Sequence, residues 1–177
     1  MTPPPKDRHR GALPFRVAQL FDVMVDAVRG KDLLRYIAAA GVLAHYVGDA
    51  CQPLHVSRLH HGLPEDEVDD DVHEVYESDM LDKDANRLLV VTGVNAALAG
   101  YHAGDAEGPD LVDTAAAAAA TVVDLMARTI EAIAPSDLLD VFNNPPPGES
   151  RTTVLWNAFG EQTIERLADG SRTLAAR

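Results

Sequence analysis

The sequence predicts an all-α protein, and three observations lead to this fold class. Apolar residues recur at helical spacing along most of the 177-residue chain, helix-capping residues stand between these segments, and no period-two strand pattern persists. A chain of this length with 46% hydrophobic residues can bury roughly 70% of its unfolded surface. We therefore expect one domain over residues 1–177, built as a helical bundle.

The first half of the chain predicts two helices joined by a short turn. The apolar face of the first helix repeats at i, i+3, i+4, i+7 and i+11, and consists of Val17, Leu20, Phe21, Met24 and Val28. Gly30 stands where a helix C-cap belongs. The second helix is expected to start after Asp32 as N-cap and to run to about Cys51. Pro53 then ends or kinks it.

The acidic segment LPEDEVDDD, residues 63–71, interrupts the helical pattern and is expected to form an exposed loop. A helical face resumes with Val72, Val75 and Tyr76, and a further helix is predicted over about 84–101.

Asp113 or Thr114 can cap the long helix that follows, which Pro135 is expected to end. A short helix is predicted over about 137–142, and a last one after the turn-forming run NNPPPGES, residues 143–150. The alanine run at 115–120 is flanked by aspartates and fits a soluble helix. No stretch approaches the ~18 apolar residues that a transmembrane helix needs.

Charge and cysteine content restrict the possible functions. The formal net charge is −13, so the surface should repel nucleic-acid backbones and anionic membranes, and no stable nucleic-acid complex is expected. Binding to phosphate would need local positive charge, which bound metal ions could supply. Cys51 is the only cysteine, which excludes an intrachain disulfide. The first residues, MTPPPKDRHRG, have no apolar region and do not form a secretory signal.

Three of the seven histidines form a pattern typical of metal ligands. His45 precedes Asp49 by four residues and His73 precedes Glu77 by four, so each pair lies on one helical face. His55 follows Pro53 and can turn back toward either pair. Imidazole and carboxylate are ligands that zinc accepts without thiolate. A single pair of this kind is often a surface salt bridge, but two pairs with a histidine between them favour a metal site within the bundle.

The string HYVGDACQPLH at 45–55, followed by HEVYE at 73–77, resembles the zinc-dependent phospholipase C and single-strand nuclease superfamily, whose all-α members hold three zinc ions. The resemblance implies that His45 and Asp49 bind one zinc and that Asp49 bridges to a second ion and holds the catalytic water. It likewise implies that another zinc is bound by His55, His73 and Glu77.

The resemblance also has a weaker part at the N-terminus. His9, just before GALPFR, matches the family histidine that completes the first site, although a solvated residue in the basic run KDRHR is an equal alternative. Members of the family also use an N-terminal amino group, a histidine and an aspartate upstream of this position. The eight residues before His9 offer none of these, so we expect one or two zinc ions and a disordered or truncated tail over residues 1–8. An incomplete chain would also expose apolar surface and could self-associate.

The function implied by this resemblance is a zinc-dependent phosphodiesterase that acts on nucleic acid, nucleotide or phospholipid. The alternative is a zinc-stabilised helical domain without turnover, either an interaction or structural module or an inactive fragment.

Overall fold

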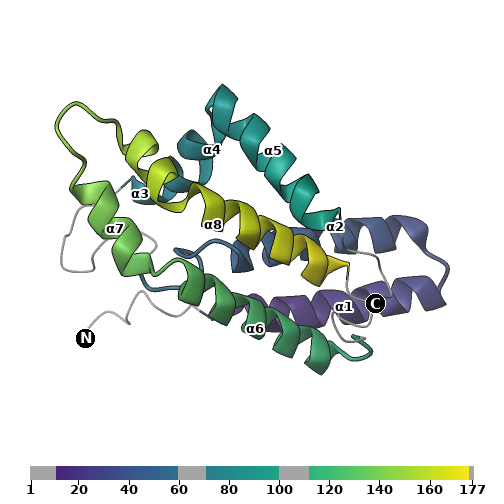
Figure 1. Ribbon diagram of the computed structural model, residues 1–177. Coiled ribbons are helices and arrows are strands. Elements are labelled where there is room, and N and C mark those ends of the chain that lie inside the picture. The colour runs from purple at the N-terminus through teal and green to yellow at the C-terminus, as the bar shows by residue number, and fades with distance from the viewer. Residues whose placement is uncertain (1–10, 60–70, 100–111, 176–177) are drawn as a thin grey trace, which may run out of the picture.

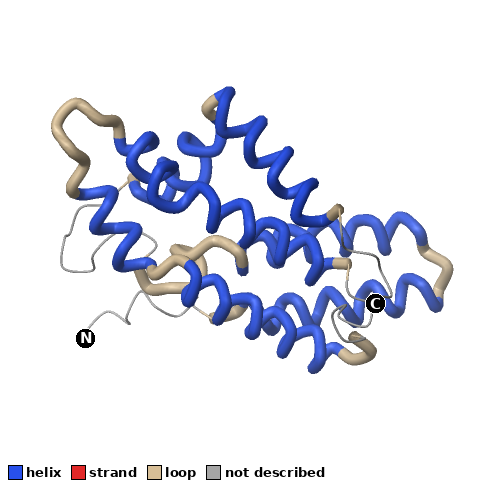
Figure 2. Tube along the Cα trace, in the orientation of Figure 1, coloured by secondary structure: helices blue, strands red, loops and turns tan. Residues whose placement is uncertain are grey.

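The computed structural model describes residues 11–59, 71–99 and 112–175, and its described residues form helices and loops without a strand (Figures 1 and 2). The elements in order are α1 (Leu13–Arg29), α2 (Leu33–Ala50), α3 (Val72–Glu74), the π-helical turn η2 (Val75–Asp79), α4 (Met80–Asp82), α5 (Asp84–Leu98), α6 (Ala115–Ala132), α7 (Pro135–Asn143) and α8 (Arg151–Leu174). The prediction of an all-α fold is confirmed. Of the helices described, none is both long and apolar enough to cross a membrane.

Local capping explains where the longer helices begin. The Asp32 carboxylate accepts the backbone N–H of Arg35 at the start of α2, as the sequence predicted. Thr114, one of the two candidate caps, accepts the backbone N–H of Ala117 and starts α6. Ser150 caps α8 in the same way. These bonds satisfy N–H groups that have no partner within their own helix.

Two local features differ from the sequence prediction. Helix α6 ends at Ala132, and Pro135 opens the next helix, α7, instead of only ending the previous one. Proline is well tolerated there, because the first N–H groups of a helix have no acceptor inside it. The second difference is η2, where the N–H of Met80 bonds to the carbonyl of Val75 in place of an α-helical partner. No pattern of residues in the sequence predicts such a π-helical turn.

The core consists of two hydrophobic clusters. One lies among α1, α2 and α6 and includes Val47, Val122 and Leu125. The other joins the 72–82 segment to α7 and α8 and includes Phe142 and Leu155. Helix α8 contacts α2 and α6 as well as α5 and α7, and it runs lengthwise across the molecule (Figure 1). This helix therefore connects both clusters.

Residues 51–59 form the bridge between the two clusters. Leu54 in this segment is fully buried. Just before it, the buried hydroxyl of Thr129 on α6 donates to the carbonyl of Ala50 at 2.8 Å. This bond fixes the C-terminal end of α2, and the segment that follows carries the candidate site.

Candidate metal centre

Three side chains from two segments converge on one point. His55 comes from the bridge after α2, His73 from α3 and Glu77 from η2. The two Nε2 atoms lie 2.8 Å apart, and Glu77 Oε2 lies 2.7 Å from Nε2 of His73 and 3.1 Å from Nε2 of His55. Within the described parts of the chain, these residues form the one group of three or more potential ligands that is close enough to hold a metal ion. The resemblance had assigned the same three residues to one ion.

Asp49 lies behind this group on the other side of the His55 ring. Its Oδ1 is 3.2 Å from Nδ1 of His55, and both side chains are about one-fifth exposed. Because a carboxylate only accepts, Nδ1 of His55 carries the proton and Nε2 is left free to bind a cation. An aspartate that orients a histidine ligand in this way is common around protein metal sites.

The other two ligands, four residues apart, lie where α3 passes into the π-helical turn η2. A π turn holds one residue more than an α turn, and this rotates Met80 toward the buried side that Val72 and Tyr76 also occupy. His73 and Glu77 remain together on the opposite, more exposed side, in direct contact. π turns of this kind are frequent at functional sites.

Gln52 is a site residue that the sequence interpretation missed. It is buried, accepts the N–H of Leu54, and donates from Nε2 to Glu77 Oε2 at 3.4 Å. The signal was its place inside the string HYVGDACQPLH, between Asp49 and His55. Desolvation by burial would by itself raise the pKa of Glu77, but the hydrogen bonds that this carboxylate forms with His73 and Gln52 help to hold its pKa below its usual value.

The remaining predicted ligands have different positions. The side chain of His45 is 71% exposed, and its Nε2 lies 3.5 Å from Asp49 Oδ2, so His45 stays beside Asp49 but is not one of the three converging ligands. Asp49 thus stands between His45 and His55. His9 and residues 1–8 lie outside the described residues, as do residues 63–70 of the acidic segment. Asp71, at its end, is exposed.

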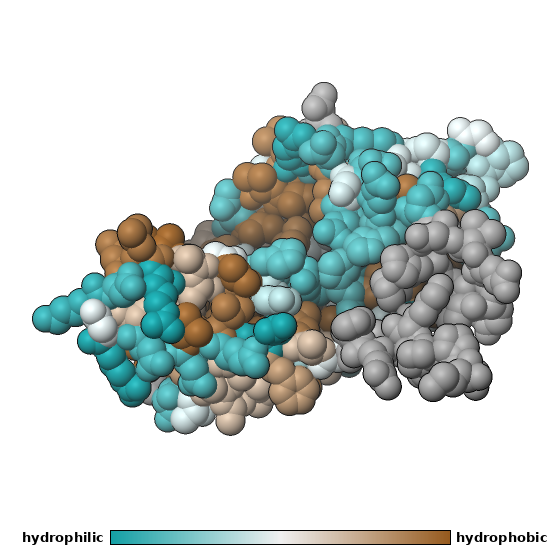
Figure 3. Space-filling view, turned by 180° about the vertical axis from the view of Figure 1, so that it is seen from behind, coloured by the Kyte–Doolittle hydropathy of each residue, from teal (hydrophilic) through white to brown (hydrophobic). Residues whose placement is uncertain are grey.

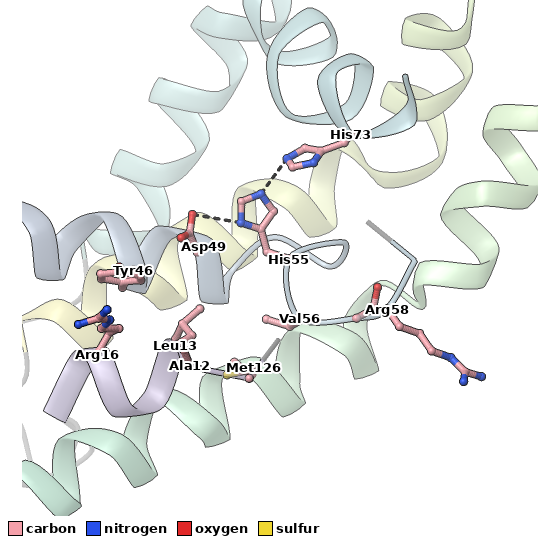
Figure 4. Close-up of a pocket in the computed structure, with 12 residues that line it drawn as sticks. Ala12, Leu13, Arg16, Tyr46, Asp49, His55, Val56, Arg58, His73 and Met126 are labelled. Atoms are coloured by element: carbon pink, nitrogen blue, oxygen red, sulfur yellow. Dashed lines mark hydrogen bonds and ion pairs between the residues drawn. The ribbon is translucent and has the colours of Figure 1, made fainter. Parts of the chain in front are cut away.

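A cavity of about 590 Å³ opens beside the three-residue group. Asp49, His55 and His73 line it together with Tyr46 and Arg16 from α2 and α1. In Figure 4, Arg16 and Tyr46 lie on one side of the cavity, and the side chain of Arg58 points away from it. The cavity therefore opens onto His55 and His73, whereas Glu77 is not part of its lining.

The spacing of the three ligand atoms is close to what a bound cation requires. With the His55 proton on Nδ1, two ring nitrogens and one carboxylate oxygen converge, and the neutral His73 ring offers at most one N–H for these contacts. Tetrahedral zinc at ~2.0–2.1 Å from each ligand needs ligand atoms about 3.3 Å apart. The observed separations of 2.7, 2.8 and 3.1 Å need to open by only a few tenths of an ångström. The donor set of two imidazoles and one carboxylate therefore fits zinc.

Comparison with known proteins gives one informative relative. A protein of Bradyrhizobium tropiciagri named as a probable serine protease is 34% identical over 190 residues, a match that covers 95% of this chain and 24% of the relative. The chain therefore spans about a quarter of the length of this relative, whose name is that of an enzyme. No protein-family model and no solved structure matches the chain.

Proposed function

We propose that this protein is a zinc-dependent phosphodiesterase whose metal is held by His55, His73 and Glu77. The observation that carries the proposal is the convergence of the two Nε2 atoms and Glu77 Oε2 within 3.1 Å of one another. A bound zinc ion supplies a hydroxide at neutral pH and polarises a phosphoryl oxygen. The resemblance of the 45–55 and 73–77 segments to zinc phosphodiesterases supports this reaction.

The chain's own residues would bind the ion and place the substrate. Asp49 fixes the proton of His55 on Nδ1, and Gln52 supports Glu77 from the buried side. Asp49 and His45, 3.5 Å apart, are the proposed ligands of a second ion. Asp49 would thus bind the second ion and also orient His55, a ligand of the first. Arg16 stands at the cavity wall, where a guanidinium can pair with a phosphate oxygen.

Serine-protease chemistry finds less support in the site. That mechanism needs a serine hydroxyl hydrogen-bonded to a histidine whose other nitrogen meets a carboxylate. Asp49 and His55 supply the carboxylate and histidine, but His73 and Glu77 occupy the far side of that ring. Ser57, which also lines the cavity, donates to the Leu54 carbonyl instead. Among the described residues, no serine hydroxyl is hydrogen-bonded to a histidine.

The second candidate function is a zinc-stabilised helical domain without turnover. It is favoured by the match to about a quarter of a longer protein, because a quarter of a longer protein need not carry its activity. Both candidates bind zinc through the same residues, so they differ in turnover.

The test compares two glutamates of the same segment. Glu77→Gln removes a ligand, while Glu74→Gln changes an exposed side chain that is absent from the three-residue group. Both proteins and the parent are reconstituted with zinc, analysed for bound metal, and assayed on bis(p-nitrophenyl) phosphate, single-stranded DNA and phosphatidylcholine vesicles. We expect the parent and Glu74→Gln to bind zinc and cleave at least one substrate, and Glu77→Gln to lose at least 10²-fold in activity.

Each outcome separates the candidates. Zinc binding by the parent with no hydrolysis of any of the three substrates favours the domain without turnover. Less than a third of a zinc equivalent on the parent, after exposure to excess zinc, contradicts both candidates.

A further inference from the structure

The outward face of α2 is apolar and has no partner among the described residues. Its centre line is formed by Leu34, Gly41 and Gly48, which are seven residues apart, with Ile37 and His45 beside them. Leu34 is 82% and Ile37 57% exposed. The other sides of α2 contact α1, α6 and α8. In the view from behind, apolar surface gathers at the left end, where the turn between α1 and α2 lies, and in a central hollow (Figure 3).

Packing within a single copy does not require either of the two glycines. A Cβ added to Gly41 or Gly48 would meet nothing within 4 Å. Glycine weakens a helix relative to alanine, and neither position has a conformation that requires glycine, since both lie inside a regular helix. Exposed glycines seven residues apart are useful where another helix approaches closely.

The order of large and small residues along this face fits a second copy in antiparallel orientation. With a two-fold axis at Gly41, residues at equal distances on either side of it face each other. Leu34 of one copy then meets Gly48 of the other, and Ile37 meets His45, so each large aliphatic side chain lies over a smaller or flatter neighbour. A parallel pair would place Leu34 against Leu34 and leave a gap between the glycines.

Charge favours the same arrangement. From Leu33 to Gly48 the only fully charged side chain is Arg35, and Asp49 follows at the other end. An antiparallel pair brings Arg35 of each copy toward Asp49 of the other, whereas a parallel pair brings Arg35 against itself. The net charge of −13 disfavours an anionic bilayer as the occupant of this face. The absence of acidic residues along the strip removes that repulsion between two copies.

We propose that the outward face of α2 is a homodimer interface in which two copies pack antiparallel about a two-fold axis at Gly41. Such an interface is isologous, with the same patch used on both copies. It covers the exposed leucines of α2 and encloses His45, while the cavity beside Asp49 opens at its edge. The interface overlaps His45 and Asp49, the proposed ligands of a second ion, but it requires neither the metal held by His55, His73 and Glu77 nor phosphodiester hydrolysis.

Cysteine cross-linking tests the axis and the register in the full chain. Gly41→Cys places two thiols at the axis, so mild oxidation should give a disulfide-linked dimer in high yield. Leu34→Cys alone should not cross-link, because its two copies would lie about 21 Å apart along the helices, well beyond the reach of a disulfide. A mixture of the Leu34→Cys and Gly48→Cys proteins should cross-link to each other. The parent, whose Cys51 is buried, is the background control.

Sedimentation equilibrium supplies an independent measurement. The parent should dimerise, and Leu34→Arg should raise the dimer dissociation constant at least 10-fold. Leu88→Arg, at a leucine on α5 that is 69% exposed, should leave this dissociation constant unchanged. Circular dichroism of each variant checks that it is folded.

Three results would overturn the proposal. The first is a parent that stays monomeric at about 100 μM. The second is efficient cross-linking of Leu34→Cys with itself, which indicates a parallel pair. The third is a monomer that binds phosphatidylcholine–phosphatidylserine vesicles through Leu34, which assigns this face to a membrane.

Discussion

At the scale of single residues, Asp49 is the side chain on which both parts of the candidate centre depend. It touches His55 through Oδ1 and His45 through Oδ2. Asp49→Asn keeps the size of the side chain but removes the charge that orients His55. We expect zinc affinity to fall about 10–100-fold, the usual effect of losing the partner that orients a histidine ligand. Competition with a chromogenic chelator measures this affinity.

Asp71→Asn is the matched control for this change. Asp71 is exposed, and its ion pair with Arg151 at 3.4 Å is of the surface type that contributes little. Equal losses of affinity in the two variants would contradict a special position for Asp49.

Two buried residues predict how stability changes at high pH. Burial, helped by the charge of Asp169, raises the pKa of Cys51 to about 11, and burial raises the pKa of Tyr76 to about 12. In the unfolded chain these groups ionise near ~8.5 and ~10. Their contribution to stability is therefore complete below about pH 8.5 and is lost as the pH rises toward 12, by on the order of 3 kcal/mol for each group.

Urea unfolding at pH 8 and at pH 11 measures this loss. Tyr76→Phe removes the phenol, so its free energy of unfolding should fall less between these two pH values than that of the parent. A parallel fall in both proteins would show that Tyr76 does not contribute.

At the scale of helices, the hydrogen bond from the Thr129 hydroxyl to the Ala50 carbonyl connects α6 to the end of α2. Thr129→Val keeps the shape but leaves the buried carbonyl of Ala50 without this donor. We expect the free energy of unfolding to fall by about 1–3 kcal/mol. For a chain of this size, each kcal/mol lowers the melting temperature by roughly 2–4 °C. Thr121→Val is the control, because the Thr121 hydroxyl donates only to Ala117 within its own helix. Similar losses in both variants would show that the contact with α2 is unimportant.

At the scale of the whole molecule, the candidate metal centre connects the bridge after α2 to the 72–82 segment. A ligand that binds only the folded state stabilises it, by ≈ 2.7 kcal/mol at a concentration 100 times its dissociation constant. Removing zinc with excess chelator should therefore lower the melting temperature by several degrees. Glu77→Gln, which has lost a ligand, should show a much smaller change. An unchanged melting curve of the parent would contradict a metal bound by these three residues.

The sequence could predict those features of the structure that depend on contacts between residues close together in the chain. The helix starts at Asp32 and Thr114 depend on one side chain and the N–H three residues later, so capping residues and apolar spacing predicted them. The pairing of His73 with Glu77 is equally local, because both lie on one turn. Pro135 was assigned to the end of one helix when it begins the next. Proline disfavours helix before it and tolerates helix after it, so local rules allow both readings.

The convergence of His55 on His73 and Glu77 required more than local spacing. The family resemblance assigned these three residues to one ion. The contact between them arises because Leu54, in the bridge after α2, packs beside η2 in the core cluster that also contains α7 and α8. The π turn and the support from Gln52 depend on that packing as well and have no periodic signal. The sequence by itself thus determined the helices and the two histidine–carboxylate pairs, because these depend on contacts within a single turn. The tertiary structure decided that His55 lies between the two pairs, with Asp49 at Nδ1 and with His73 and Glu77 at Nε2. It also decided which face of α2 is left uncovered by the other described residues, because both features depend on how separate helices pack.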